Sequence, residues 1–153
     1  MAKAKDADSV LKMIKDEDIQ FVDFRFTDPR GKMQHVTFHD NLIDEDAFAD
    51  GVMFDGSSIA GWKEINESDM TLMPDIDTCH IDPFYGQSTL AVFCDVLEPE
   101  TGEGYSRDPR MTAKKAEAYV KQTKTGDTVF VGPEAEFFVF DDVRFSSEPY
   151  NMG

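Results

Sequence analysis

The chain has 153 residues, of which 31 are acidic and 15 are basic, so its formal net charge is −16. This excess of negative charge argues against binding to nucleic acid or to anionic membrane surfaces. Cys79 and Cys94 are too few for a disulfide-stabilised scaffold, and no apolar run is long enough to span a bilayer. No apolar signal-peptide region follows the N-terminus, so we expect a cytoplasmic protein.

A short amphipathic helix is predicted over residues 6–16. Either Asp6 or Asp8 is suitably placed to cap its first turn. The apolar positions that share one face are Val10, Leu11 and Ile14. The helix therefore has one side to bury against the rest of the fold.

A β-hairpin is predicted next, because two alternating segments flank a turn. The segments are residues 19–26 and 33–39, and Asp28-Pro29-Arg30-Gly31 has proline and glycine where a type I turn favours them. The inward-facing positions are Val22, Phe24, Phe26, Val36 and Phe38. One or two helical turns are expected over residues 43–50.

The middle of the chain is predicted to be mostly extended. Residues 51–63 form a glycine- and serine-rich loop, which apolar residues interrupt in a way that is unusual for a simple linker. Residues 70–85 are expected to be extended segments and turns. Residues 89–97 form a strand with every second side chain apolar on one face: Leu90, Val92, Cys94 and Val96.

The best candidate for a domain boundary is residues 98–108, which are rich in proline, glycine and charge. Asp108 and Pro109 then suit the cap and the first position of a helix, which we expect to run to about Thr123 and to end at Gly126. These elements predict a small mixed α+β domain that is followed by the start of a second one. The expected divisions are residues 1–16, 17–105 and 106–153.

Glu134 and Glu136 lie in a run, residues 129–140, that is apolar on both parities. Such a run is typical of a strand covered on both faces, where positions two apart point to the same side. Carboxylates on a buried strand need a partner, and Mg²⁺ or Mn²⁺ prefer oxygen ligands. The alternatives are a wet edge strand, which Pro133 favours, or pairing with lysine or arginine.

The loop around Asp55 is the second candidate site. One carboxylate, two serine hydroxyls and glycine backbone groups fall close together, and they suit a polar ligand or proton transfer. An Asx-type turn is the alternative interpretation. His35 and His39 are four residues apart on a predicted strand, which places them about 13 Å apart, too far to share a metal. We expect both histidines to be at the surface or hydrogen-bonded.

Two segments together resemble the glutamine synthetase family of the bacterial type I. The segment that starts Phe54-Asp55-Gly56-Ser57-Ser58-Ile59 and continues through Gly61-Trp62 to Glu67-Ser68-Asp69-Met70 resembles its N-terminal signature. The segment Val131-Gly132-Pro133-Glu134-Ala135-Glu136-Phe137-Phe138 resembles its first metal-ligand strand, with Ala135 where many members have proline. The resemblance runs from about residue 10 onward in the family's order.

The resemblance implies a β-grasp-like N-terminal domain, followed by the start of a catalytic α+β domain. It implies an enzyme that makes glutamine from glutamate, ammonia and ATP through γ-glutamyl phosphate, with two divalent ions. By this resemblance Asp55 binds and deprotonates ammonium, and Ser58 contacts the substrate region. Glu134 holds the ion nearer the ATP phosphates, and Glu136 holds the ion nearer glutamate. The resemblance also implies neighbouring identical subunits as partners, in a dodecamer of two hexameric rings.

The family's other metal ligands and its substrate-binding arginines have no counterpart in these 153 residues. We therefore expect the isolated chain to bind metal weakly and to be inactive. Two other functions remain open. One is a non-enzymatic β-grasp-like module for assembly or binding, and the other is an unrelated metal-dependent phosphotransferase.

Overall fold

The computed structural model describes residues 6–148 and 150–152. The helices are α1 (Ala7–Asp16), α2 (Glu45–Ala49) and α3 (Pro109–Gln122). The strands are β1 (Phe21–Thr27), β2 (Met33–His39), β3 (Val52–Asp55), β4 (Asp69–Pro74), β5 (His80–Ile81), β6 (Thr89–Leu97), β7 (Ser147–Glu148) and β8 (Asn151–Met152). Short 3₁₀ turns are η1 (Asp40–Leu42), η2 (Gly56–Ser58), η3 (Ile65–Glu67) and η4 (Ile76–Thr78).

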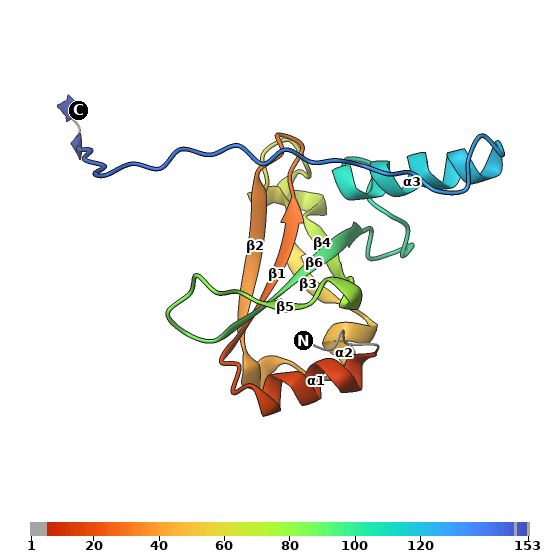
Figure 1. Ribbon diagram of the computed structural model, residues 1–153, viewed down its shortest axis with the longest axis horizontal. Helices are drawn as coiled ribbons and strands as arrows, with labels where there is room; N and C mark the ends of the chain where they lie inside the picture. Colours follow the sequence, from red (N-terminus) through yellow and green to blue (C-terminus); the bar gives the residue numbers. More distant parts are fainter. Residues whose placement is uncertain (1–5, 149, 153) are drawn as a thin grey trace.

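A mixed sheet forms the centre of the molecule (Figure 1), and its strand order is β2-β1-β6-β4-β3, with β5 beside β6. The hairpin strands β1 and β2 are antiparallel, and Phe24 lies opposite Val36. The neighbours β1 and β6 are parallel, and Phe24 lies opposite Val92. A sheet that contains both parallel and antiparallel strand pairs, with helices packed against it, confirms the predicted α+β class.

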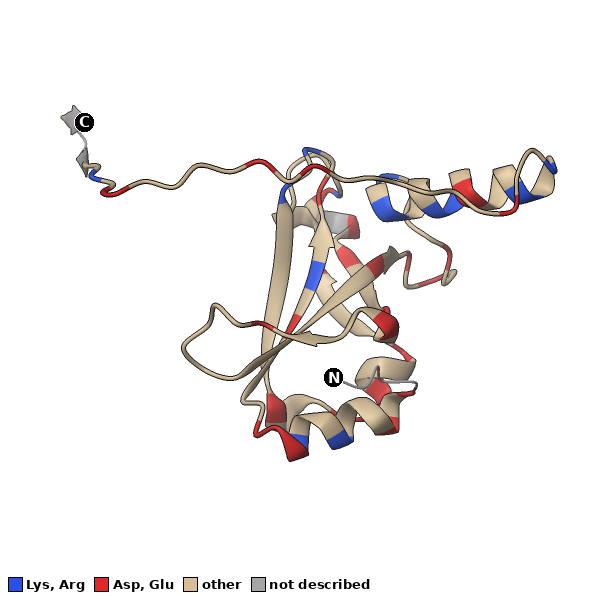
Figure 2. Cartoon of the chain, viewed as in Figure 1, with Lys and Arg blue, Asp and Glu red and all other residues tan. Residues whose placement is uncertain are grey.

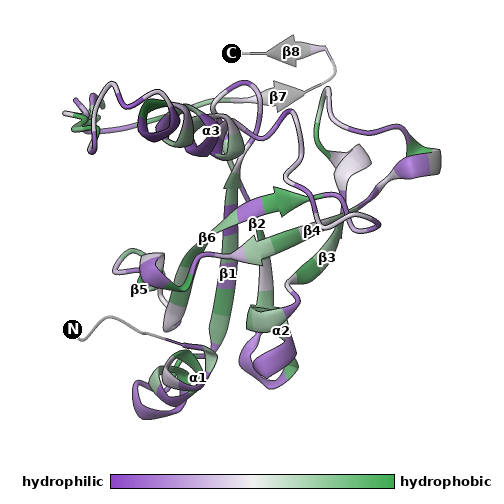
Figure 3. Ribbon diagram, turned by 90° about the vertical axis from the view of Figure 1, so that its right-hand side faces the viewer, coloured by the Kyte–Doolittle hydropathy of each residue, from purple (hydrophilic) through white to green (hydrophobic). Residues whose placement is uncertain are grey.

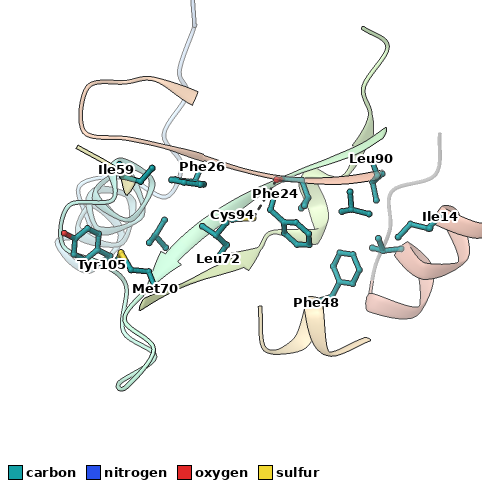
Figure 4. Close-up of a cluster of buried hydrophobic side chains, with 14 of the residues drawn as sticks. Ile14, Phe24, Phe26, Phe48, Ile59, Met70, Leu72, Leu90, Cys94 and Tyr105 are labelled. Carbon is teal, nitrogen blue, oxygen red and sulfur yellow. Dashed lines mark hydrogen bonds between the residues drawn. The ribbon is translucent and has the colours of Figure 1, made fainter. Parts of the chain in front are cut away.

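The hydrophobic core lies between the sheet and the helices α1 and α2. Figure 4 shows Ile14 of α1 and Phe48 of α2 pointing toward Phe24 and Leu90 of the sheet. Figure 3 shows the hydrophobic stretches in β1, β3 and β4 that supply the sheet side. The most completely buried apolar side chains are Val10, Val22, Phe24, Met70, Leu72, Leu90, Ala91, Val92 and Val96. The inward positions predicted for β1 and β6 are therefore confirmed.

Local hydrogen bonds explain why α1 and the hairpin form where they do. Asp6 caps α1, because its carboxylate accepts the Ser9 backbone N–H at 2.9 Å. In the hairpin turn, the Gly31 N–H donates to the Asp28 carbonyl at 2.9 Å, and Gly31 has a φ of +83°. The Asp28 carboxylate accepts the backbone N–H groups of Arg30 and Lys32, each at 2.9 Å. The predicted helix and turn are confirmed.

Part of the segment predicted as a loop, residues 51–63, is a strand. Residues Val52–Asp55 form β3, which pairs antiparallel with β4. The backbone of Gly51 makes this possible, because it adopts a φ of +82° and approaches the Leu72 carbonyl closely. A Cβ at position 51 would lie 2.6 Å from that oxygen. Sequence alone gave no signal for this close approach.

Helix α3 begins as predicted, with the Asp108 carboxylate accepting the Arg110 backbone N–H at 2.9 Å. Asp108 is fully buried, and its other oxygen accepts the Val96 N–H of β6 at 3.0 Å. The Arg110 side chain donates to Asp95 at 2.8 Å. The helix ends at Gln122, and the left-handed residue that follows it is Lys124, with a φ of +56°, rather than Gly126.

The predicted strand over residues 129–140 is wrong. Figure 1 shows an extended trace beyond α3, and the structure assigns these residues no helix or strand. Their large apolar side chains are exposed, including Val131 at 80% and Phe138 at 86%. A strand must pair its backbone groups with a neighbour, and no strand within residues 6–148 pairs with this segment. No helix among the described residues is long and apolar enough to cross a membrane.

Candidate functional site

Asp55 lies at the end of β3, where the chain leaves the sheet for the 3₁₀ turn Gly56–Ser58. Pairing with β4 fixes this position, because Phe54 lies opposite Met70 and Asp55 lies opposite Asp69. The next residue, Gly56, is buried, and its N–H donates to the Ser68 carbonyl at 2.7 Å. A Cβ on Gly56 would lie 2.5 Å from the Met70 sulfur, so only glycine fits without movement of that side chain.

The Asp55 carboxylate is exposed, and one of its oxygens is held by Ser57. That oxygen accepts the Ser57 backbone N–H at 2.8 Å and the Ser57 hydroxyl at 2.6 Å. These two hydrogen bonds lower the pKa of Asp55 from its ordinary value of 3.8, with smaller contributions from the hydroxyls of Ser68 and Ser58. The loop therefore presents a fixed anion at neutral pH. Both interpretations of the sequence therefore apply to Asp55, which forms an Asx-type turn with Ser57 and is also the carboxylate of the candidate ligand site.

Ser58 is exposed and follows Ser57 in the turn, whereas the next residue, Ile59, is buried in the core. Figure 4 shows Ile59 near Phe26 at the end of the core opposite Ile14. The serine hydroxyls therefore stay at the surface while the apolar residue beside them anchors the loop. This arrangement accounts for the apolar residues that interrupt the glycine- and serine-rich sequence.

Trp62 anchors the far side of the same loop. It is 5% exposed, and its ring centroid lies 5.4 Å from that of Phe26, 6.1 Å from that of Phe54 and 5.3 Å from that of Tyr105. Its indole N–H is buried without a hydrogen-bond partner among the described residues. A buried donor without a partner costs about 1–3 kcal/mol, which the burial of a large aromatic ring offsets.

Sequence reasoning missed the polar residues that hold the end of this loop. Lys63 Nζ contacts both carboxylate oxygens of Glu98, at 2.9 and 2.8 Å. The Arg107 guanidinium donates to the backbone carbonyls of Gly61 and Trp62, the latter at 3.2 Å. All three residue pairs are separated by more than 30 positions, so no local pattern in the sequence relates them.

Glu134 and Glu136 are not brought together with further metal-ligating side chains in the part of the chain that the structure describes. Both are exposed, in the segment that was predicted to be a buried strand. Across residues 6–148 and 150–152, no group of three or more histidine, cysteine, aspartate or glutamate side chains is arranged to hold a metal ion. Carboxylate oxygens suit Mg²⁺ or Mn²⁺ in kind, but two exposed carboxylates are too few to enclose either ion.

A polar network on the other face of the hairpin includes one of the two spaced histidines. Buried Asp23 accepts the Thr37 hydroxyl at 2.6 Å and the Arg25 Nε–H at 2.7 Å, and it lies 2.6 Å from His35 Nδ1. Arg25 also donates to Asp82 at 2.6 Å. Burial by itself raises the pKa of Asp23, but these hydrogen bonds outweigh it and the net pKa is lowered. His35 is hydrogen-bonded, as expected.

Comparisons with known proteins match two separate parts of the chain. Residues 18–99 match the family model for the glutamine synthetase β-grasp domain, and residues 106–152 match the model for the glutamine synthetase catalytic domain. Glutamine synthetases from Rhizobium meliloti and Bradyrhizobium diazoefficiens are 68% and 71% identical over 96% and 97% of this chain. The chain spans about a third of the length of these relatives, 31% and 32% respectively.

Two further similarities are to a solved structure and to a relative with a different name. A cryo-EM structure of glutamine synthetase from Plasmodium falciparum has a TM-score of 0.81 at 29% identity, and it covers 99% of this chain and 29% of that one. A relative from Cupriavidus pinatubonensis named 3-hydroxylaminophenol mutase is 57% identical over 94% of this chain and 30% of its own length. The similarity to the Plasmodium structure supports the β-grasp-like architecture.

Proposed function

Because this chain belongs to the glutamine synthetase family, we propose that it supplies the N-terminal part of an enzyme that makes glutamine from glutamate, ammonia and ATP. The proposed reaction forms γ-glutamyl phosphate first. The ammonia nitrogen then attacks the activated carbonyl carbon, phosphate leaves and one proton is released. The observation that carries the proposal is the Asp55 loop, which presents a fixed and exposed carboxylate within the family's own motif. We also propose that the enzyme is located in the cytoplasm.

The electrostatics of Asp55 support a specific role within this reaction. Hydrogen bonds from Ser57 lower the pKa of Asp55, so its carboxylate is ionised at neutral pH and attracts ammonium. A lowered pKa also makes a carboxylate a weaker base. In this proposal Asp55 binds ammonium as an anion, and proton removal takes place in the closed site of an assembled enzyme. We assign Ser58 to contact with substrate in that closed site.

Glu134 and Glu136 are proposed as two ligands of the divalent ions that the reaction uses, Mg²⁺ or Mn²⁺. In this assignment Glu134 faces the ATP phosphates and Glu136 faces glutamate. Divalent ions in such sites neutralise charge that develops during phosphoryl transfer. The exposed apolar residues around both glutamates support the assignment, because they have the composition of a strand that is buried when partner strands cover it.

We propose that the chain divides into residues 1–16, 17–105 and 106–153, and that the last part is the beginning of a catalytic domain. Identical subunits, arranged as a dodecamer of two hexameric rings, are proposed as partners. In such an assembly the Asp55 loop of one subunit and the Glu134 segment of its neighbour contribute to a single active site. This sharing does not require Asp55 and Glu134 of one chain to meet.

A chimeric enzyme tests the proposal directly. Residues 1–153 are joined to the part of the Bradyrhizobium diazoefficiens relative that this chain does not span. We expect glutamine formation that depends on glutamate, ammonium and ATP. Asp55→Asn should reduce the rate at low ammonium by about a hundredfold, which is a typical loss for a group that moves or holds a proton. Asp77→Asn, at an exposed site outside the motif, is the control.

Two outcomes would contradict the proposal. A folded, oligomeric chimera without glutamate-dependent ATP consumption would favour a β-grasp-like module for assembly or binding. Conversion of 3-hydroxylaminophenol without any glutamine formation would place the chain with the relative that carries that name. Dependence on glutamate also separates this enzyme from an unrelated phosphotransferase, which would hydrolyse ATP without it.

A further inference from the structure

The loop that carries Asp55 is attached at its far end to the segment that joins the sheet to α3. Trp62 packs against Tyr105, Lys63 pairs with Glu98, and Arg107 holds the carbonyls of Gly61 and Trp62. Three separate contacts therefore connect residues 61–63 with residues 98–107. Each contact joins positions more than 30 residues apart, so tertiary structure alone creates the attachment.

We propose that the Lys63–Glu98 pair and Arg107 are positioning groups for the Asp55 loop. We call them the exit clamp, because they fix the chain where it leaves the loop. Entry to the loop is fixed separately, by the pairing of β3 with β4 and by the Gly56 N–H bond to Ser68. Asp55 is the last residue of the paired strand, whereas Ser57, which holds its carboxylate, and Ser58 lie between the two fixed ends. The assignment of Asp55 to ammonium rests on the proposed function, whereas the clamp itself rests only on the contacts.

Burial and charge favour Lys63–Glu98 as the stronger part of the clamp. The Lys63 side chain is 18% exposed and the Glu98 side chain 34%, whereas the pair Lys121–Glu117 on α3 is 57% and 55% exposed. Hydrogen bonding to Glu98 raises the pKa of Lys63 above its ordinary value. Lys63 Nζ also lies 5.4 Å from the centre of the Tyr105 ring, which adds a cation–π contact.

Arg107 gives the clamp its geometry. Its guanidinium contacts two successive carbonyls, so it fixes the direction of the backbone at Gly61 and Trp62. Gly61 has a φ of +84°, a conformation that the chain adopts to turn back toward the core. The next residue after Arg107 is Asp108, which is buried and bonded to the Val96 N–H of β6. The clamp is therefore held by a rigid part of the sheet.

Trp62 makes the loop easy to observe, because it is the single tryptophan in the chain. Acrylamide quenching of its fluorescence reports on access to the loop, and amide exchange reports on residues 56–63 directly. The test compares Glu98→Gln with Glu117→Gln, since both glutamates pair with a lysine. It also compares Arg107→Gln with Arg144→Gln, because Arg144 pairs with Asp142 in an exposed position.

We expect Glu98→Gln and Arg107→Gln to accelerate exchange in residues 56–63 by about fivefold, as loss of a partly buried ion pair opens the loop locally. Quenching of Trp62 should rise in both. Glu117→Gln and Arg144→Gln should change neither. Unchanged exchange in residues 56–63 would overturn the clamp. So would equal acceleration throughout β1, β4 and β6, because that pattern indicates global destabilisation.

Activity of the chimeric enzyme supplies the second readout. Displacement of the loop should raise KM for ammonium by about tenfold and leave kcat within about twofold, because the loop acts through Asp55 rather than on phosphate transfer. A loosened loop with an unchanged KM for ammonium would overturn the positioning role. An inactive chimera with the wild-type clamp would instead contradict the proposed function, while exchange and fluorescence would still decide whether the clamp exists.

Discussion

The Asp55 loop and the segment that carries Glu134 and Glu136 differ in how their carboxylates are placed. Asp55 is oriented by its own neighbour, Ser57, and its loop is anchored by buried Ile59 and Trp62. Glu134 and Glu136 lie among apolar residues that remain exposed. Figure 2 shows acidic residues in both parts of the molecule, so charge does not distinguish the two segments.

The difference shows which carboxylates a chain can place by itself. A turn in which an aspartate carboxylate accepts from the residue two positions later needs only near neighbours in the sequence, and a loop with apolar anchors needs only the core beneath it. A strand that carries carboxylates needs partner strands on its edges and covering layers on its faces. The Asp55 carboxylate is therefore already oriented in this chain. Glu134 and Glu136 depend on structure that residues 6–148 do not supply.

The largest expected difference in stability between the two regions comes from replacing one phenylalanine in each. Phe24→Ala removes a fully buried ring and should lower the free energy of unfolding by about 3–5 kcal/mol. Phe138 is 86% exposed, so Phe138→Ala should change the free energy by less than about 0.5 kcal/mol. Urea unfolding followed by circular dichroism measures both. Similar losses in the two variants would show that residues 129–140 are packed in solution.

A smaller loss is expected from the backbone that positions Asp55. Gly51→Ala places a Cβ against the Leu72 carbonyl and requires a φ near +82°, so it should cost about 2–3 kcal/mol. At Gly86 a Cβ meets no atom within 4 Å, so Gly86→Ala is the matched control, with an expected change below about 0.5 kcal/mol. Equal stability of the two variants would disprove the close approach of Gly51 to β4.

The polar network of the hairpin adds a dependence on pH. Hydrogen bonds lower the pKa of Asp23 below its ordinary value of 3.8, so the stabilisation is present above that value and is lost as the pH falls through the lowered pKa. Asp23→Asn should cost about 1–2 kcal/mol at pH 7 and flatten the acid limb of the stability curve. Unfolding measured from pH 7 to pH 2 checks this.

Exposed Asp77 provides the control for this measurement. Asp77→Asn should leave the stability at pH 7 unchanged. An Asp23→Asn variant with the wild-type acid limb would show that the buried network does not couple to protonation. The acid sensitivity that remains in Asp23→Asn should come partly from Asp28, whose pKa is also lowered, first by its hydrogen bond to Gln34.

The smallest effects are expected at the two glutamates of the extended segment. Glu134→Gln and Glu136→Gln should each change the free energy of unfolding of this chain by about 0–0.5 kcal/mol. Addition of Mg²⁺ or Mn²⁺ should leave its thermal midpoint almost unchanged, since weak binding at low occupancy stabilises little. A clear upward shift that either substitution abolishes would show that the chain completes a metal site by itself.

The sequence predicted the elements whose causes are local or repetitive. Asp6, Asp108 and the Asp28 turn act over a few residues, and the alternation in β1 and β6 follows from the geometry of a strand. The two family motifs were also evident from adjacent residues. The predicted strand over residues 129–140 failed because apolar residues on both parities show that a segment needs cover, but they do not provide it.

Sequence by itself therefore determined the α+β class, the helix starts, the hairpin turn and the family to which the motifs belong. Only the tertiary structure decided that β1 and β6 lie parallel, that Gly51 approaches β4, and that Lys63 and Arg107 hold the Asp55 loop. The physical reason is how far apart in the sequence the interacting residues lie. Caps, turns and alternation are interactions between near neighbours, whereas strand order and the exit clamp join residues that are brought together only when the core forms.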